Sequence, residues 1–341
     1  MQDIDFYSRL RLPPSPKKPD GKWRRVGFEL EFAGLGPLKA ARIITELYGG
    51  RIEEESVFVL SIADTAFGDF RIEIDASLLK EKRYENFLHS VGVDIGRWDK
   101  KRSLEEFILK FAQEFVPCEI VAPPIPLNRI PEMDRLRAEL YRARARGTRE
   151  SIFYAFGLHL NIEPVELTRD SILSVLRAFI LVEPAIRSKS KTDVVRMLTP
   201  YIDNYPADYM RMVVDADYDP PLLSDLARDY MLYNPSRNRS LDMMPLFAYL
   251  EPEMLSGFDT RDKLVKPRPA YHYRLPNSSV SEPDWSLLYD WNIWVRVEEL
   301  AADSELLAEF SREFIRLAGF PHNIFNNWRK RILAWLAQGR A

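Results

Sequence analysis

The stretch Val26-Gly-Phe-Glu-Leu-Glu-Phe32 decides the fold of this chain. Successive side chains of a β-strand point to opposite faces. A strand here therefore places Glu29 and Glu31 on one face and the apolar residues, among them Phe28 and Leu30, on the other. The alternation predicts a half-buried strand whose exposed face carries two carboxylates.

The same alternation recurs in four later segments, and each again puts chemically active side chains on one face. The segments do not alternate with helices as βαβ units do. We therefore predict an α+β fold, in which strands around 26–32, 70–75, 119–122, 157–162 and 271–275 form one mainly antiparallel sheet with helices over its apolar face. The polar sets are Arg71, Glu73 and Asp75, then Glu119, then His159 and Asn161, and finally His272 and Arg274.

The domain organisation follows from the positions of prolines, capping residues and apolar runs along the chain. Residues 1–22, which are rich in proline, are expected to be an irregular lead-in. Residues 23–300 form the main domain, with a mostly helical insertion at about 165–265, and residues 301–341 form helices packed on the same domain. A capping box at Ser103–Glu106 predicts a helix that ends near Phe115, and residues 131–146 predict a helix rich in arginine.

Composition excludes several classes of protein. The chain has 341 residues and a formal net charge of -3, so no global field draws it to nucleic acid or to an anionic membrane. No apolar run approaches the roughly 20 residues of a membrane span. The N-terminal segment lacks the apolar core of a signal peptide. The single cysteine fits a reducing compartment, so we expect a cytoplasmic protein.

The polar residues on the predicted sheet are unusual for a face that only meets water. Each pair alone is compatible with a solvated face, which antiparallel sheets often have. Together the carboxylates would repel one another without cations, and carboxylate oxygens are ligands that Mg²⁺ prefers. The arginines, including Arg71, suit bidentate capture of phosphate or carboxylate. Because the chain has no Walker loop, metals and arginines on the sheet would have to hold any nucleotide.

Two further arginines, Arg237 and Arg239, lie in a polar segment before the apolar run 241–250. They either bind an anionic substrate or belong to an ordinary polar loop ahead of a core helix.

The ordered series of short motifs resembles the amidoligase family, a branch of the glutamine synthetase and γ-glutamylcysteine synthetase superfamily. The resemblance covers about residues 23–300. Its motifs are Gly-x-Glu-x-Glu at 27–31, Asp-x-Ser-Leu at 75–78, Glu-Ile-Val-Ala-Pro at 119–123, Gly-Leu-His-Leu-Asn at 157–161 and Tyr-His-Tyr-Arg at 271–274.

The resemblance implies an antiparallel sheet of the glutamine synthetase catalytic type that cradles ATP, Mg²⁺ and a substrate carboxylate. It implies metal-binding roles for Glu29, Glu31 and Glu119, a metal or phosphate role for His159, a site-organising role for Asp75 and a phosphate contact for Arg274. Two departures stand out. Asn161 replaces a family histidine, and we expect it to bind ATP or substrate, since it can still ligate or hydrogen-bond. His272 replaces a family carboxylate, and we expect it to help Arg274 hold an anion of ATP or substrate, because Mg²⁺ prefers oxygen ligands.

The function that these features predict is ATP- and Mg²⁺-dependent joining of a small-molecule or peptide carboxylate to an amine through an acyl phosphate. A base must deprotonate the amine, and Glu73 is a candidate. Two alternatives stay open: phosphoryl transfer to a guanidinium on the same fold, and a catalytically impaired scaffold that binds ATP or another ligand. By resemblance, a glutamine amidotransferase-like or ATP-grasp protein is an expected partner.

Overall fold

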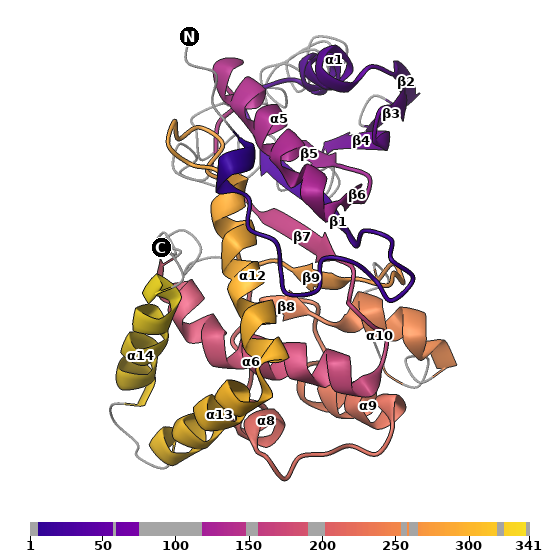
Figure 1. Cartoon of the computed structure of the whole chain (residues 1–341). Helices are drawn as coiled ribbons and strands as arrows, with labels where there is room; N and C mark the ends of the chain where they lie inside the picture. The colour runs from indigo at the N-terminus through magenta and orange to yellow at the C-terminus, as the bar shows by residue number, and fades with distance from the viewer. Residues whose placement is uncertain are drawn as a thin grey trace, which may run out of the picture.

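Figure 1 shows a computed structural model of the chain. It describes residues 6–56, 59–74, 118–147, 156–189, 202–253, 258, 265–318 and 324–338. Within these ranges no helix has both the length and the apolarity that crossing a membrane requires.

Most strands of the described chain lie in its first half and most helices in its second half, a distribution typical of an α+β protein. The strands are β1 Arg25–Phe32, β2 Arg51–Ser56, β3 Val59–Thr65, β4 Gly68–Ile74, β5 Cys118–Val121, β6 Ile125–Pro126, β7 Leu158–Ile162, β8 Leu241–Asp242 and β9 Tyr271–Tyr273. The helices are α1 Pro37–Tyr48, α5 Ile130–Arg142, α6 Arg169–Lys189, α8 Ala207–Val214, α9 Leu223–Tyr233, α10 Met244–Leu250, α12 Leu287–Ala302, α13 Ser304–Ala318 and α14 Ile324–Gln338, with 3-10 turns at Tyr7–Arg9 and Leu127–Arg129.

All nine strands belong to one open sheet in the order β2-β3-β4-β5-β1-β7-β9-β8, with β6 paired to β1. Every pairing between these strands is antiparallel. The prediction that the five polar-faced segments share one mainly antiparallel sheet is therefore confirmed. Strand β1 lies in the middle of the sheet, so its carboxylates have neighbours on both sides.

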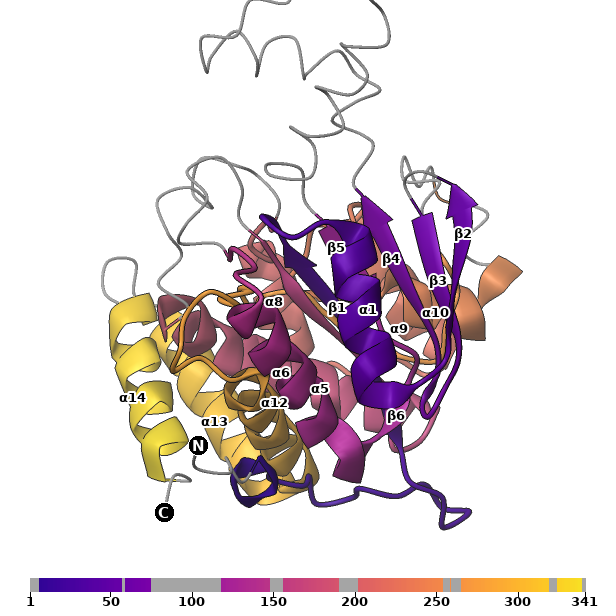
Figure 2. The same ribbon diagram turned by 90° about the horizontal axis from the view of Figure 1, so that it is seen from above.

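Helices cover the apolar face of the sheet (Figure 2). On α1, Tyr48 stacks on Phe70 of β4 with ring centroids 5.7 Å apart. At the other end, Trp294 of α12 packs 5.6 Å from both Tyr271 and Tyr273 of β9. These tyrosines alternate with His272, so burying them turns the histidine toward the opposite, polar face. The apolar residues predicted to face the core, Phe28, Leu30, Ile72, Ile74, Leu158 and Leu160, are all buried.

The N-terminal lead-in is tied to this helical layer by a buried ion pair. Arg24 has no exposed surface, and its Nη1 and Nη2 donate to the two oxygens of Glu298 on α12 at 2.6 and 2.7 Å. Its Nη1 also donates to the carbonyl oxygen of Ser15 at 2.8 Å. The pair therefore joins the start of β1, the lead-in and α12.

Four strands lie outside the five polar-faced segments. Strand β3 corresponds to a strand that the sequence predicts at about 57–62, whereas the other three were not predicted, and each has a physical reason. Strand β2 lies at the sheet edge, where nearly all of its side chains are exposed, so it lacks the apolar alternation. Strands β6 and β8 have two residues each. One of the two interpretations of the segment at 237–250 placed a core helix over the apolar run 241–250, but the start of this run, Leu241–Asp242, is strand. The helix begins at Met244, with Pro245 in its first turn, where proline is tolerated. The helix predicted from Ser103 to Phe115 lies outside the described residues.

Candidate functional site

The polar face of the sheet brings together residues from four neighbouring strands. On the central strand, Glu29 pairs directly across with His159 of β7. One step along, Asn161 pairs with His272 of β9, and His272 pairs in turn with Asp242 of β8. Residues directly opposite on antiparallel strands have Cβ atoms about 4.5–5.5 Å apart. The pairing therefore builds a compact cluster from residues far apart in sequence.

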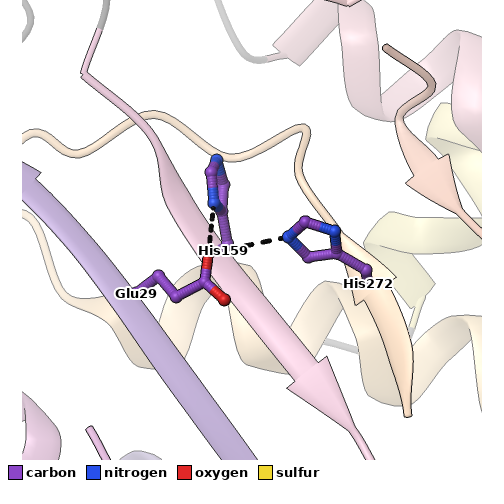
Figure 3. A group of neighbouring side chains, drawn as sticks. All are labelled: Glu29, His159 and His272. Atoms are coloured by element: carbon purple, nitrogen blue, oxygen red, sulfur yellow. Dashed lines mark hydrogen bonds and ion pairs between the residues drawn. The ribbon is translucent and has the colours of Figure 1, made fainter. Parts of the chain in front are cut away.

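Glu29, His159 and His272 point toward one another in this cluster (Figure 3). The Nδ1 atom of His159 lies 2.8 Å from Oε2 of Glu29, and Nε2 of His272 lies 3.7 Å from the same oxygen. Each residue offers one ligand atom within 4.8 Å of the others. Among the described residues this is the one group of three or more histidine, cysteine or acidic side chains with such spacing.

His272 is oriented by a second carboxylate. Its Nδ1 lies 3.3 Å from Oδ2 of Asp242, and both side chains are buried. A proton donated from Nδ1 to Asp242 leaves Nε2 with its lone pair directed into the cluster. This Nε2 is buried and has no hydrogen-bond partner in the described part of the chain. A carboxylate behind a histidine is a common way of fixing the tautomer of a metal-binding imidazole.

Gly157 is required by the close approach of His159. A Cβ atom at this position would lie 2.7 Å from Nε2 of the histidine. Its backbone N–H donates to Oε2 of Glu31 at 2.6 Å. Any larger residue would therefore displace the imidazole and disturb Glu31 with it.

Burial and hydrogen bonding set the charges of this cluster. Burial lowers the pKa of His159 from 6.5 to about 4, although the hydrogen bond and charge of Glu29 act in the opposite direction. Burial opposes ionisation of Glu29, yet the hydrogen bond to His159 and the nearby imidazole of His272 hold its pKa well below its usual range. At neutral pH the site thus contains a carboxylate beside a neutral imidazole, the forms in which both groups bind metal.

The depressed pKa of His159 predicts a loss of stability in acid. Between about pH 4 and 6.5 the unfolded chain binds the proton more readily than the folded chain, so the free energy of unfolding falls as pH drops through this window. The low pKa of Glu29 extends the fall below its usual pKa. We expect a loss of roughly 2–3 kcal/mol from His159. Urea unfolding between about pH 4 and 6.5 should show this loss. The free energy of unfolding of a His159→Gln variant should depend less steeply on pH. Equal pH dependence in the variant and the wild type would contradict the depressed pKa of His159.

The other predicted metal ligands form a row beside the cluster. Glu31 pairs across the strands with Glu119, and Glu119 pairs with Glu73. Glu73 forms an ion pair with Arg71, whose Nε lies 2.6 Å from Oε1 of the glutamate, and both side chains are over one-third exposed. The structure thus places three carboxylates in line on β1, β5 and β4. The metal role of Glu31 and Glu119, the base role of Glu73 and the binding role of Arg71 stay predictions.

The predicted anion-binding arginines occupy the other end of the face. The guanidinium of Arg274 donates from Nη1 to the carbonyl oxygen of Arg237 at 2.5 Å, and Nε of Arg237 lies 3.7 Å from Asp242. Arg239 is buried, and its guanidinium already donates to Oδ1 of Asn234 and to the carbonyl oxygen of Asn204. Arg237 and Arg274 therefore lie near the cluster, whereas Arg239 joins the segment to the helical part. Asp75 lies outside the described residues.

Two residues of the cluster were missed by sequence reasoning. Asp242 is the one acidic residue in an apolar run, which was a usable signal. Arg268 lies between Pro267 and Pro269, four residues before His272, in a segment without periodicity. Its Nε donates to Oδ1 of Asn161 at 2.9 Å, and its Nη2 lies 3.6 Å from Oε1 of Glu29.

The donor atoms fit a divalent cation. Two imidazole nitrogens and one carboxylate oxygen converge at Glu29, and an imidazole nitrogen left without a partner is directed at them. Such a mixed set suits Mn²⁺ or Zn²⁺ better than Mg²⁺, which prefers oxygen ligands. The neighbouring row of Glu31, Glu119 and Glu73 offers oxygens alone.

Comparison with known proteins agrees with the motifs on this face. A search of curated proteins and a search of solved structures gave no match. The sequence profile of a family described as "Putative amidoligase enzyme" matches residues 22–296, which include the whole sheet and its polar face. The chain belongs to this amidoligase family.

Proposed function

We propose that the protein is an ATP- and Mg²⁺-dependent ligase that joins a carboxylate to an amine through an acyl phosphate. The observation that carries the proposal is the polar face of the sheet. Glu29, His159 and His272 converge there between a row of carboxylates and a group of arginines. Family membership supports the formation of an amide bond.

The two ends of this face suit different parts of the reaction. Glu29, Glu31 and Glu119 would hold Mg²⁺, which neutralises phosphate charge when bound. Arg274 and Arg237 would bind the transferred phosphoryl group or the substrate carboxylate, because a guanidinium cannot lose its charge at working pH. His159 and Asn161 would position the reacting groups through their contacts with Glu29.

In the first step a carboxylate oxygen of the substrate attacks the γ-phosphorus of ATP, a new P–O bond forms and ADP leaves. In the second step the amine attacks the acyl carbon, phosphate leaves and the amine proton passes to a base. Glu73 is our candidate for this base, and Asp75 would organise the site. The position of His272 between Asp242 and Glu29 favours a role in the cation cluster over direct contact with phosphate.

A turnover assay tests the proposal. The purified chain is incubated with ATP, Mg²⁺ and mixtures of carboxylic acids and amines, and ADP release and products are measured. We expect ADP release that requires both an acid and an amine, with a product that has gained an amide bond. A phosphorylated guanidine would instead establish phosphotransfer. Binding of ATP without turnover, in any mixture, would favour the scaffold.

Cytoplasmic location is part of the proposal, because the ligase requires ATP. An amidotransferase-like or ATP-grasp partner that supplies or consumes the amide product would fit the same chemistry.

A further inference from the structure

The two carboxylate oxygens of Glu29 have separate sets of partners. Oε2 is the atom that faces His159 and His272. Oε1 faces the other way and accepts a hydrogen bond from Nδ2 of Asn161 at 2.8 Å, with Nη2 of Arg268 at 3.6 Å. The carboxylate therefore has one side toward the imidazoles and one side toward an amide and a guanidinium.

Arg268 and Asn161 act on Glu29 as one unit. Nε of Arg268 donates to Oδ1 of Asn161 at 2.9 Å, which fixes the amide with its Nδ2 toward Glu29. The Oδ1 atom of Asn161 accepts the hydrogen bond from Arg268, and only its Nδ2, a donor, faces the cluster. Asn161 is therefore not placed to ligate a cation.

The backbone of Arg268 is itself held in place. Prolines on both sides restrict it. Its N–H donates to the carbonyl oxygen of Pro245, and its own carbonyl accepts from the N–H of Ala270.

We infer that Arg268 is a positioning residue that, together with Asn161, keeps Oε1 of Glu29 occupied, so that a bound cation meets Oε2 alone. The inference rests on the cation site in the proposed function. It predicts selection among metals. A carboxylate held to one oxygen suits a small octahedral ion, whereas Ca²⁺ takes six to eight oxygens and readily uses both oxygens of a carboxylate. The pair thereby disfavours Ca²⁺ at this site.

The ratio of the Ca²⁺ affinity to the Mn²⁺ affinity separates the effect of Arg268 on carboxylate coordination from the effect of its charge. Removing the guanidinium changes the electrostatic potential at the site, and this change acts in a similar way on every divalent cation. The ratio of the Ca²⁺ dissociation constant to that of Mn²⁺ cancels most of it. What remains is the coordination that Glu29 allows.

The experiment measures Mn²⁺ binding by electron paramagnetic resonance, with Ca²⁺ as competitor and without ATP or substrate. For Arg268→Ala we expect the preference for Mn²⁺ over Ca²⁺ to fall about 10-fold, the scale on which partners of metal ligands act. Arg268→Lys keeps the charge but loses the fork, and it should show a similar fall. Asn161→Ala should also lower the ratio, and the double variant should lose no more than the larger single effect.

Lys266→Ala is the matched control, because Lys266 is an exposed cation two residues away. Its ratio should equal that of the wild type. If the wild type binds Mn²⁺ and Arg268→Ala and Arg268→Lys leave the ratio unchanged, the inference is overturned while the proposed function stands. Absence of Mn²⁺ binding in the wild type would overturn both. If Arg268→Ala does not fold, the lysine variant decides.

Discussion

Replacement of Glu29 by glutamine is expected to lower both the affinity for metal and the rate of ligase turnover at least about 100-fold. Loss of a residue that merely supports a metal ligand typically costs about 10–100-fold, and Glu29 is the shared centre of the cluster. Its Oε2 contacts both histidines and its Oε1 contacts Asn161. Glutamine keeps the size of the side chain but removes its charge, and its amide nitrogen cannot accept a hydrogen bond.

Calorimetric titration with Mn²⁺ and the ADP-release assay measure the two effects separately. Glu53→Gln is a suitable control, because Glu53 is a half-exposed carboxylate on the edge strand of the same sheet. The control should bind and turn over as the wild type does. A Glu29→Gln protein with a wild-type melting temperature, wild-type affinity and wild-type turnover would mean that the cluster is not the metal site.

The largest effect on stability is expected for Glu298→Ala, which should lower the free energy of unfolding by about 3–5 kcal/mol. The substitution leaves the fully buried guanidinium of Arg24 without its carboxylate partner, so that it loses two hydrogen bonds at once. It also removes the acceptor of the Trp294 indole N–H, which donates to Glu298 at 2.6 Å. A buried charge without its partner is far more costly than the absence of the whole pair.

Urea unfolding of Glu298→Ala beside Glu299→Ala tests this argument. Glu299 is the next residue, but it is partly exposed, and so are its ion-pair partners Arg11 and Arg296; exposed pairs contribute about 0–1 kcal/mol. A second variant, Arg24→Met combined with Glu298→Leu, should recover much of the loss. If the two alanine variants are equally stable, the Arg24–Glu298 pair does not anchor the lead-in as described.

The strand faces were predictable because they depend on a period of two, which is local. Glu29, His159 and His272 were each assigned correctly to the polar face, opposite residues that are buried. Strand register was not predictable. Pairings between distant segments determine that Glu29 lies opposite His159. They likewise place Glu31 beside Gly157 and opposite Glu119. For this reason the sequence suggested a triad of carboxylates, whereas the group of ligand atoms that the described residues bring together contains two imidazoles.

Asp242 and Arg268 show a second limit. Asp242 reaches the cluster from a two-residue strand, and Arg268 reaches it from a segment between prolines without regular structure. Neither has a periodic pattern to mark its face. Both are positioned by tertiary contacts, with His272 in one case and with Asn161 in the other. The lone acidic residue in the apolar run 241–250 marks Asp242 as unusual, but its place in the cluster, like that of Arg268, depends on the assembled strands.

The strand order has a consequence for folding during translation. Strand β1 is paired on one side with residues 118–121 and on the other with residues 158–162, so Glu29 and His159 are 130 positions apart. His272 emerges from the ribosome more than one hundred residues later still. At synthesis rates of about 5–20 residues per second, both edges of β1 stay without their partner strands for several seconds. The nascent chain therefore needs protection from aggregation in that interval, and the cation cluster is completed only after most of the chain has been made.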